Sequence, residues 1–236
     1  MKLKTIGIIG GMGALATVDL FQKIVINTYA ECDQEHIPVL IDNNTQIPDR
    51  TEYLTKNGIN PLDALIFSAS RLEKMGADFL LLSCNTAHSL YNKLSSCIGI
   101  PIINMLEETA REVSNMGIKK VGMLGTKGFI KGVDYKSFYN DFGIDVLCPT
   151  STEQNAVSEL IYQGVKAQKD DIDTKPFSKL LKRLSNAGAE TFVLSCTELP
   201  IAFSKFKFRN KYPRIDPALI LARKAILTAG GTLLTS

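Results

Sequence analysis

Two cysteines of this chain each directly follow a hydrophobic run, and the two runs have similar sequences. Cys84 follows residues 76–83, which read Gly-Ala-Asp, four large apolar residues and Ser. Cys196 follows residues 188–195, which read Gly-Ala-Glu, Thr, three apolar residues and Ser, and it comes 112 residues after Cys84. A thiolate takes a proton and a thiol returns one, so two such residues at one site suit proton transfer at carbon.

Each run is typical of a buried central strand of a parallel sheet, because its apolar residues are continuous. In open α/β sheets, ligands bind in the crevice beyond the carboxyl ends of the strands. Two such ends in a duplicated chain would face each other across a cleft, with one sulfur on each face of a substrate carbon. A free thiol with a pKa of about 8.5 is only slightly ionised at neutral pH. The site must therefore hold one cysteine as thiolate and the other as thiol.

A glycine-rich landmark repeats along with the cysteines. Gly10 follows an apolar strand expected at 5–9, and Gly125 stands at the matching place in the similar segment 119–128, an offset of 115 residues. The second strand of each half is expected at 38–42 and at 144–147. We therefore predict an α/β fold of two pseudo-symmetric domains, each a mostly parallel sheet flanked by helices, with the active site in the interdomain cleft.

The periodicity of apolar residues predicts the other elements. Helices are expected at 14–31, 60–75, 107–117, 153–168, 177–186 and 218–228, with a strand at 101–104 and a polar loop at 43–51. The first helix carries an apolar stripe of Leu15, Val18, Phe21, Ile24 and Val25. The last helix begins with Asp216 as N-cap and Pro217 at its first position, and should return to the first domain. The predicted domains are residues 1–104 with 212–236, and residues 105–211.

The turn after the first strand, Gly10-Gly11-Met12-Gly13, brings backbone N–H groups to the start of a helix, where an anion can bind. Its glycines give GxxGxxG rather than the dinucleotide GxGxxG, and no acidic residue ends the second strand at the expected distance. This argues against NAD and favours a small carboxylate, while a tight turn without ligand stays open.

Arg50 and His88 have two readings each. Arg50 follows the second strand and is either a surface arginine or a clamp for a carboxylate, which the guanidinium fork matches bidentately. His88 lies one helical turn after Cys84, so it either tunes that thiol or packs locally.

Charge and composition exclude several classes of protein. The net charge of +3 is too weak to indicate a nucleic-acid partner, and the basic segment 205–211 is expected to be a solvated face. Five cysteines at unrelated spacings, without CxxC, argue against a disulfide framework and for a reducing compartment. No targeting segment is visible, and no apolar run approaches the roughly 20 residues of a membrane span. We expect a cytoplasmic protein without a membrane partner.

The loop Gly10-Gly11-Met12-Gly13, the segment Cys84-Asn85-Thr86-Ala87-His88 and the segment Cys196-Thr197-Glu198-Leu199 together resemble the motifs of the cofactor-independent aspartate/glutamate racemase superfamily. The aspartate racemases are the branch that the chain resembles most, over essentially its whole length. The resemblance implies a homodimer and neither pyridoxal phosphate nor a metal. The scarcity of histidines, two in all, and the lack of a Cys/His cluster agree with the absence of a metal site.

The resemblance also implies the site residues. Cys84 and Cys196 would be the two acid/base residues, with Cys196 acting on L-aspartate and Cys84 on D-aspartate. Asn85, Thr86 and Thr197 would hold the α-amino and α-carboxylate groups. The other residues that match the family pattern are Met12 and Gly13, which would close the pocket, Arg50 and Lys166, which would bind carboxylates, and Glu198 of the last motif, which we count among the substrate-binding residues.

Some departures from the family bear on the substrate. Ala14 stands where such sequences often have proline. Glutamate racemases usually carry Asp-Ser-Gly in the first loop and Cys-Thr-His in the last motif, which argues against glutamate here. The related decarboxylases need one cysteine and this chain has both. We predict an aspartate racemase; the alternatives are a broad-specificity amino-acid racemase, a non-catalytic amino-acid-binding protein and a thiol-redox protein.

Overall fold

The computed structural model describes residues 3–208 and 210–234. Positions 1–2 and 235–236 of the predicted first domain lie outside the described residues, and so does Arg209 of the basic segment 205–211.

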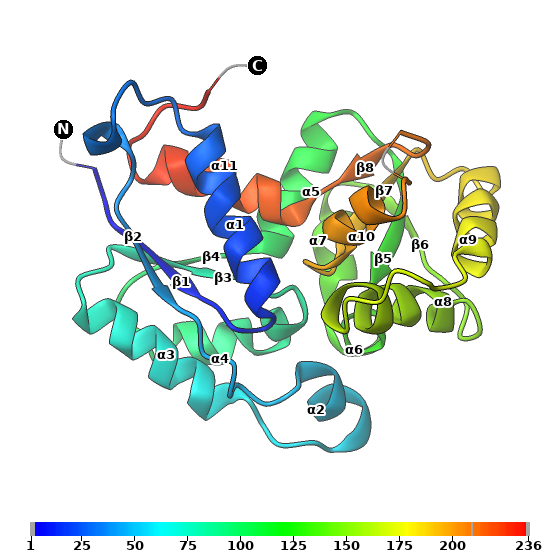
Figure 1. Ribbon diagram of the computed structural model, residues 1–236, viewed down its shortest axis with the longest axis horizontal. Helices are drawn as coiled ribbons and strands as arrows, with labels where there is room; N and C mark the ends of the chain where they lie inside the picture. Colours follow the sequence, from blue (N-terminus) through cyan, green and yellow to red (C-terminus); the bar gives the residue numbers. More distant parts are fainter. Residues whose placement is uncertain (1–2, 209, 235–236) are drawn as a thin grey trace.

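Within the described residues, the chain forms two parallel sheets of four strands each, in the same strand order. The first has the order β2-β1-β3-β4 and the second the order β6-β5-β7-β8. Their strands are β1 (Ile6–Ile9), β2 (Val39–Asp42), β3 (Phe79–Leu82), β4 (Ile102–Ile103), β5 (Lys120–Gly125), β6 (Asp145–Leu147), β7 (Thr191–Ser195) and β8 (Arg214–Ile215). Figure 1 shows the two halves side by side, each with helices around its sheet. The predicted α/β class with two pseudo-symmetric halves is confirmed.

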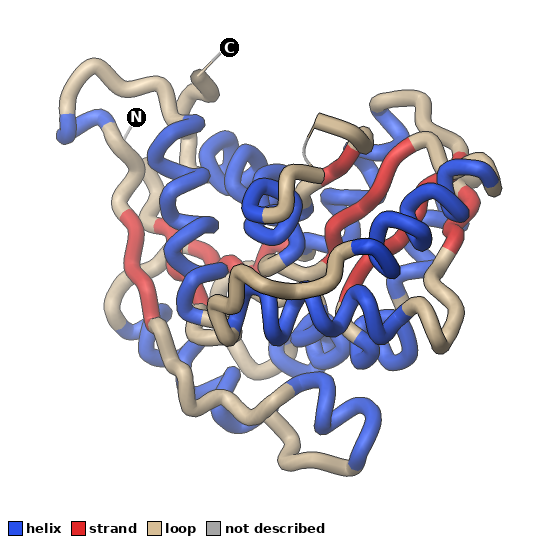
Figure 2. The backbone as a smooth tube through the Cα atoms, turned by 45° about the vertical axis from the view of Figure 1, so that its right-hand side comes forward, coloured by secondary structure: helices blue, strands red, loops and turns tan. Residues whose placement is uncertain are grey.

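Helices cover the sheets on both faces, as Figure 2 shows. The helices that follow the strands of the first sheet are α1 (Ala14–Asn27), α2 (Arg50–Lys56), α3 (Leu62–Lys74), α4 (Tyr91–Ser95) and α5 (Met105–Asn115), with the 3-10 helices η1 (Asp33–Glu35) and η2 (Thr86–Leu90). Those that follow the second are α6 (Lys127–Gly132), α7 (Tyr135–Asp141), α8 (Gln154–Glu159), the π-helix η3 (Leu160–Lys166), α9 (Lys175–Asn186), α10 (Leu199–Lys205) and α11 (Pro217–Thr228).

The central strands are buried because both of their faces are covered. Every residue of β1, β3 and β7 is buried, which is why their sequences read as continuous apolar runs. In the first half, apolar residues of α1 and α11 fill one side of the sheet and those of α3 the other. In the second half, α9, α10 and η3 cover one side, and α5, α6 and α7 the other.

The last helix behaves as predicted. Asp216 caps α11 by accepting hydrogen bonds from the backbone N–H groups of Ala218 and Leu219, and Pro217 occupies the first turn. The helix then packs against α1 and α5. β8, just before it, pairs with β7 of the second sheet, so the chain crosses between the halves at Asp216. The division into domains at 104/105 and 211/212 stays a prediction.

The apolar stripe assigned to the first helix faces the wrong way. Of its five residues only Ile24 is buried, and the side of α1 against the sheet consists of Ala16, Thr17, Leu20 and Ile24. Leu15, Val18, Phe21 and Val25 are exposed instead. The helix has apolar residues on two faces, and periodicity alone does not say which of them meets the sheet.

Several boundaries also differ. α1 ends at Asn27 rather than at residue 31, because Thr28 forms a β-bridge with Leu233 near the other end of the chain. The segment 43–51, expected as a loop, contains the start of α2, and α6, α7 and α10 were not predicted. The expected helix 153–168 is α8 continued by η3. None of the described helices is long and apolar enough to cross a membrane.

Candidate active site

A cavity with an empty volume of about 310 Å³ lies where the two halves meet. Nine of the ten site residues predicted from the sequence line it, and four residues join them that were not predicted. The lining residues are Met12, Asp49, Arg50, Thr51, Cys84, Asn85, Thr86, Thr126, Tyr162, Lys166, Cys196, Thr197 and Glu198.

The tenth, Gly13, lies just behind the lining. It is the N-cap of α1, and a Cβ built on it would lie 3.3 Å from Glu198 Oε1. The first half therefore approaches the second closely here. The positive end of the α1 dipole stands beside the Glu198 carboxylate, which it stabilises.

Cys84 is held by the end of its strand. Both the backbone N–H and the hydroxyl of Ser83 donate to the carbonyl of Ile9, at 3.2 and 3.0 Å, which ties the end of β3 to β1. Cys84 follows at once and is buried. Its thiol is therefore placed by the sheet rather than by a flexible loop.

His88 fixes the backbone at Cys84 and does not touch its thiol. Because the N–H of Met105 can only donate, His88 Nε2 accepts from it at 3.2 Å, and Nδ1–H donates to the carbonyl of Cys84 at 2.9 Å. Complete burial lowers the pKa of His88 to about 4, against the opposing effect of the Cys84 carbonyl. The ring is therefore neutral at physiological pH, and of the two readings the local packing role is the one observed.

Cys196 sits beside a carboxylate. Its thiol donates to Glu198 Oε2 at 3.0 Å, and the Thr197 hydroxyl donates to the same oxygen at 3.3 Å. Burial raises the pKa of Cys196 well above its ordinary value, and the negative charge and hydrogen bond of Glu198 raise it further, whereas Lys166 opposes them. Cys196 therefore carries its proton at neutral pH when the cavity holds no substrate.

Lys166 reaches the cavity from the last residue of η3. Its Nζ lies 3.5 Å from Glu198 Oε1 and 5.5 Å from the centre of the Tyr162 ring. Burial works to lower the pKa of Lys166, but the negative charge of Glu198, together with the charges that Cys196 and Cys84 carry when they are ionised, outweighs burial and raises it. The ammonium is thus charged, and it feels both cysteines. Tyr162 precedes it by one turn of a π-helix, a form common at functional sites.

Arg50 is a buried guanidinium without a carboxylate partner among the described residues. Nη1 donates to the carbonyls of Ile47 and Pro48, Nη2 donates to the carbonyl of Met12, and Nε has no partner. Carbonyl oxygens orient a guanidinium but leave its charge uncompensated. Of the two readings from the sequence, a surface arginine is therefore excluded. A buried cation in this state is ready to receive an anion.

Asn85 is the second group that lacks a partner. It is 1% exposed, and neither Oδ1 nor Nδ2 makes a hydrogen bond with the described residues. Buried amides nearly always have partners, so an amide left bare on a cavity wall points to a ligand that supplies both an acceptor and a donor. A carboxylate and an ammonium on one carbon meet that need.

The glycine-rich turn is organised by its own contacts. Gly10 N–H donates to the carbonyl of Asp42, and Gly11 N–H donates to the Thr17 hydroxyl. Gly11 has φ of +86°, and a Cβ there would lie 2.2 Å from the backbone of Asn44. These two N–H groups are therefore used within the turn and are not available to an anion.

The unpredicted residues tie the halves together around the cavity. The hydroxyls of Thr86 and Thr126 lie 3.0 Å apart, and the Tyr162 hydroxyl donates to Thr51 at 3.4 Å. One signal was readable: Asp49 and Glu52 stand three apart, a spacing typical of a helix start, and Asp49 does cap α2. Thr126 sits at the position that Gly11 occupies in the first half, so the duplication itself marked it.

No group of three or more His, Cys, Asp or Glu side chains in residues 3–208 and 210–234 is arranged to hold a metal ion. The five cysteines are all free.

Comparison with known proteins identifies the family. The Asp/Glu/Hydantoin racemase family matches residues 9–225. The chain belongs to this family. Amino-acid racemisation is the activity that this membership assigns.

Individual relatives extend the match to most of the chain. An aspartate racemase structure from Picrophilus torridus is 31% identical with a TM-score of 0.82, covering 98% of this chain and 96% of its own. The broad specificity amino-acid racemase RacX of Bacillus subtilis is 26% identical over 94% of this chain and 97% of its own length. A glutamate racemase from Limosilactobacillus reuteri is 25% identical over 95% of this chain and 80% of its own length.

Proposed function

We propose that this racemase interconverts L- and D-aspartate without a cofactor, by proton transfer between Cα and two cysteines. The observation that carries the proposal is the position of Cys84 and Cys196. They follow equivalent strands of the two halves, are equally buried, and line one cavity. An amino-acid-binding protein has no need of two thiols there, and a thiol-redox pair would need them in one motif.

The two thiols have complementary roles as acid and base. Cys196 holds a proton against Glu198 and returns it to one face of Cα, while Cys84 as thiolate removes the proton from the other face. After one turnover the roles are exchanged. By resemblance, Cys196 acts as base on L-aspartate and Cys84 on D-aspartate.

The bare polar groups of the cavity support an amino acid with a second carboxylate. Asn85, with Thr86 and Thr197 beside it, holds the α-amino and α-carboxylate groups. Arg50 receives the β-carboxylate, because an uncompensated guanidinium and an unpaired carboxylate each stabilise the other in a water-poor site. Met12 and Gly13 close the first-half side of the pocket. Glu198 accepts hydrogen bonds from Cys196 and Thr197 and receives the substrate ammonium.

Lys166 supports aspartate less strongly than Arg50 does, because Glu198 already compensates part of the Lys166 charge. This favours a second candidate, a broad-specificity amino-acid racemase such as the Bacillus subtilis relative is named to be. The buried Arg50 guanidinium, which has no carboxylate partner among the described residues, is the observation that supports aspartate over this second candidate.

The test follows deuterium from solvent into Cα. Aspartate, glutamate, alanine and serine of each hand are incubated with the protein in D₂O, and NMR and chiral chromatography record exchange and inversion. We expect both for aspartate, with activity unchanged by a metal chelator or by hydroxylamine and lost to iodoacetamide. Binding of aspartate without exchange would leave a binding protein.

The first variants remove one sulfur each. Cys84→Ala and Cys196→Ala should each lower racemisation by at least about 10³-fold, within the range that a positioned acid or base contributes. Because the remaining thiol serves one face only, each variant is expected to exchange Cα–H of one enantiomer without inverting it. The same deuterium assay measures this, with circular dichroism as a check that the fold is intact. Wild-type inversion in either variant contradicts the two-base mechanism.

A second prediction concerns substrate choice. Arg50→Ala should lower kcat/KM for aspartate far more than for alanine or serine. Removing one partner of a buried ion pair costs about 2–5 kcal/mol, or roughly 30- to 5000-fold in rate. The measurement is kcat/KM for both substrates in wild type and variant, with Lys56→Ala, an exposed lysine of the same helix, as control. Equal losses for both substrates would assign Arg50 to the α-carboxylate.

We also propose a cytoplasmic homodimer, with aspartate as its small-molecule partner and neither a membrane nor a nucleic-acid partner. Free catalytic thiols need a reducing compartment. The exposed apolar face of α1, formed by Leu15, Val18, Phe21, Val25 and Ile26, supports the dimer, because patches of this kind on a soluble protein mark interfaces.

A further inference from the structure

Helix α2 carries three residues of the cavity at its beginning, Asp49, Arg50 and Thr51, and stands apart from the sheet of its own half. Figure 2 shows it at the end of a long excursion of the chain, and Figure 1 shows it below α6. Arg50 is the only residue of α2 that is buried. The helix packs against α6 of the second half and against η2. The α2 helix is therefore held largely by its contact with α6, while the Arg50 guanidinium is also oriented by the carbonyls of Met12, Ile47 and Pro48.

Two glycines in α6 make that contact possible. Two of the six residues of α6 are glycine, Gly128 and Gly132, one helical turn apart. A Cβ built on Gly128 would lie 2.7 Å from Cα of Thr51, and one built on Gly132 would lie 3.0–3.1 Å from Cβ and both Cδ atoms of Leu54. Glycine destabilises a helix relative to alanine, so these positions weaken α6 while they let α2 approach.

Helix α6 is itself firmly held within the second half. Thr126 caps α6 by accepting the N–H of Phe129, and its hydroxyl also meets Thr86 in the cavity wall. Phe129 is fully buried and stacks on Tyr135 at 4.8 Å between ring centres. A side chain added to the glycine face of α6 would therefore displace α2 rather than α6, and Thr51 is the neighbour of Arg50.

We infer that Gly128 and Gly132 are positioning residues of this enzyme: they let α2 close on α6 and so set the Arg50 guanidinium at the cavity. This seam, formed by Gly128 and Gly132 against Thr51 and Leu54, shuts one side of the site from solvent. The inference rests on the proposed function for the role of Arg50, whereas the close packing of α2 on α6 stands on the contacts alone.

The test is a graded series, Gly128→Ala and Gly132→Ala, with Gly99→Ala as the matched control. At Gly99 the added methyl group meets only the end of the Glu73 side chain within 3 Å, which can move. Gly128→Ala presses on backbone and should lower kcat/KM for aspartate by about 100-fold, the loss typical of a roughly 1 Å misplacement. Gly132→Ala presses on a side chain and should lose less.

A second change separates the seam from a general loss of structure. Leu54→Ala removes the atoms that Gly132→Ala would meet, so the double variant should regain activity. The same change should not rescue Gly128→Ala. Melting temperatures are expected to change little, because alanine favours the helix and offsets part of the contact that is lost between α6 and α2. A parallel fall of activity and melting temperature, without rescue, would overturn the inference.

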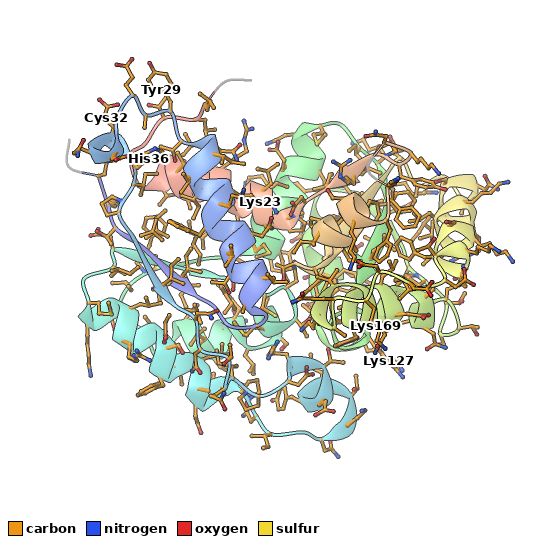
Figure 3. The ribbon with its side chains drawn as sticks, viewed as in Figure 1. Lys23, Tyr29, Cys32, His36, Lys127 and Lys169 are labelled. Carbon is orange, nitrogen blue, oxygen red and sulfur yellow. The ribbon has the colours of Figure 1, made fainter. Side chains whose placement is uncertain are left out.

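A readout independent of racemisation is the alkylation of the cysteines by iodoacetamide, followed by peptide mass spectrometry. Cys84 and Cys196 are 6% exposed, whereas Cys32 and Cys97 are exposed and serve as internal references; Figure 3 places Cys32 at the far edge of the first half. In Gly128→Ala we expect Cys84 and Cys196 to react faster relative to the references. Unchanged labelling of Cys84 and Cys196 in Gly128→Ala, together with a wild-type kcat/KM, would overturn the inference. Faster labelling in a protein that does not racemise aspartate would instead reject the proposed substrate and leave the seam standing.

Discussion

At the scale of single residues, the chemistry depends on how Glu198 and Lys166 bias Cys196. Burial raises the pKa of this thiol, Glu198 raises it further, and Lys166 lowers it. The pair of cysteines must hold one proton between them, so activity ends at high pH when that proton is lost. The apparent pKa of that step belongs to the pair, and the charges around Cys196 displace it.

The sign of each effect gives a test. Glu198→Gln removes a negative charge, lowers the pKa of Cys196, and should move the alkaline limb of the kcat/KM profile to lower pH. Lys166→Ala removes a positive charge and should move the same limb to higher pH, although it lowers the rate as well. The two enantiomers are equally stable, so kcat/KM and its pH profile must be the same in both directions. If the alkaline limb of the kcat/KM profile shifts in the same direction in both variants, Cys196 is not the cysteine whose proton is lost at high pH.

At the scale of elements, His88 joins η2 to the start of α5 through two buried hydrogen bonds. Its pKa is lowered to about 4, chiefly by burial, so the folded protein keeps the ring neutral where the unfolded chain, near pKa 6.5, binds a proton. The unfolded state then binds more protons between these values. Stability contributed by the neutral ring is fully present above about pH 6.5 and is lost as the pH falls toward 4.

We expect the free energy of unfolding to fall by about 3 kcal/mol when the pH has dropped through this whole range. Urea unfolding of the wild type and of His88→Gln at pH 7.5 and pH 4.5 measures it. The variant should start less stable, because its hydrogen bonds are poorer, and should lose less on acidification. His36→Gln is the control, since His36 is the second of two histidines in the chain. The same pH dependence in wild type and His88→Gln would mean that His88 titrates normally.

At the scale of the whole molecule, we expect the exposed apolar face of α1 to form the interface of the proposed dimer. Val18 and Ile26 are 60% and 58% exposed, and exposed apolar residues gathered on one helix favour association. Val18→Asp should give a monomer by analytical ultracentrifugation, because a charge would be buried without a partner. Ile59→Asp, at an exposed apolar residue off this face, should leave the assembly unchanged. A monomeric wild type would contradict the proposed dimer.

Elements whose pattern depends on local contacts were accessible from the sequence. The apolar runs of β1, β3, β5 and β7 show as continuous because both faces of those strands are covered. The cap at Asp216 and Pro217 acts within one turn, so its residues alone announce α11. The duplication placed the two cysteines at equivalent strand ends before any fold was known. Covered strands, local caps and internal repeats leave their mark on the sequence itself.

Other features depend on partners far along the chain. The sequence of α1 has two apolar faces, and only the sheet decides which of them is buried. β8 is two residues long and exists because β7 lies beside it. α2 starts with a readable cap, yet its place over the cavity comes from the glycines of α6.

Residue types and spacing therefore determined the fold class, the repeat, the two cysteines and Arg50 as a candidate, and the resemblance to the racemase family supplied the other predicted residues that share the cavity. The tertiary structure alone decided the charge states within that cavity. Among the described residues, Glu198 reaches Cys196, Arg50 has no carboxylate partner, and the side-chain amide of Asn85 has no hydrogen-bond partner, because burial and neighbours from both halves set those contacts. Electrostatic energies depend on distance and exposure in space, and neither is written in the order of residues along a chain.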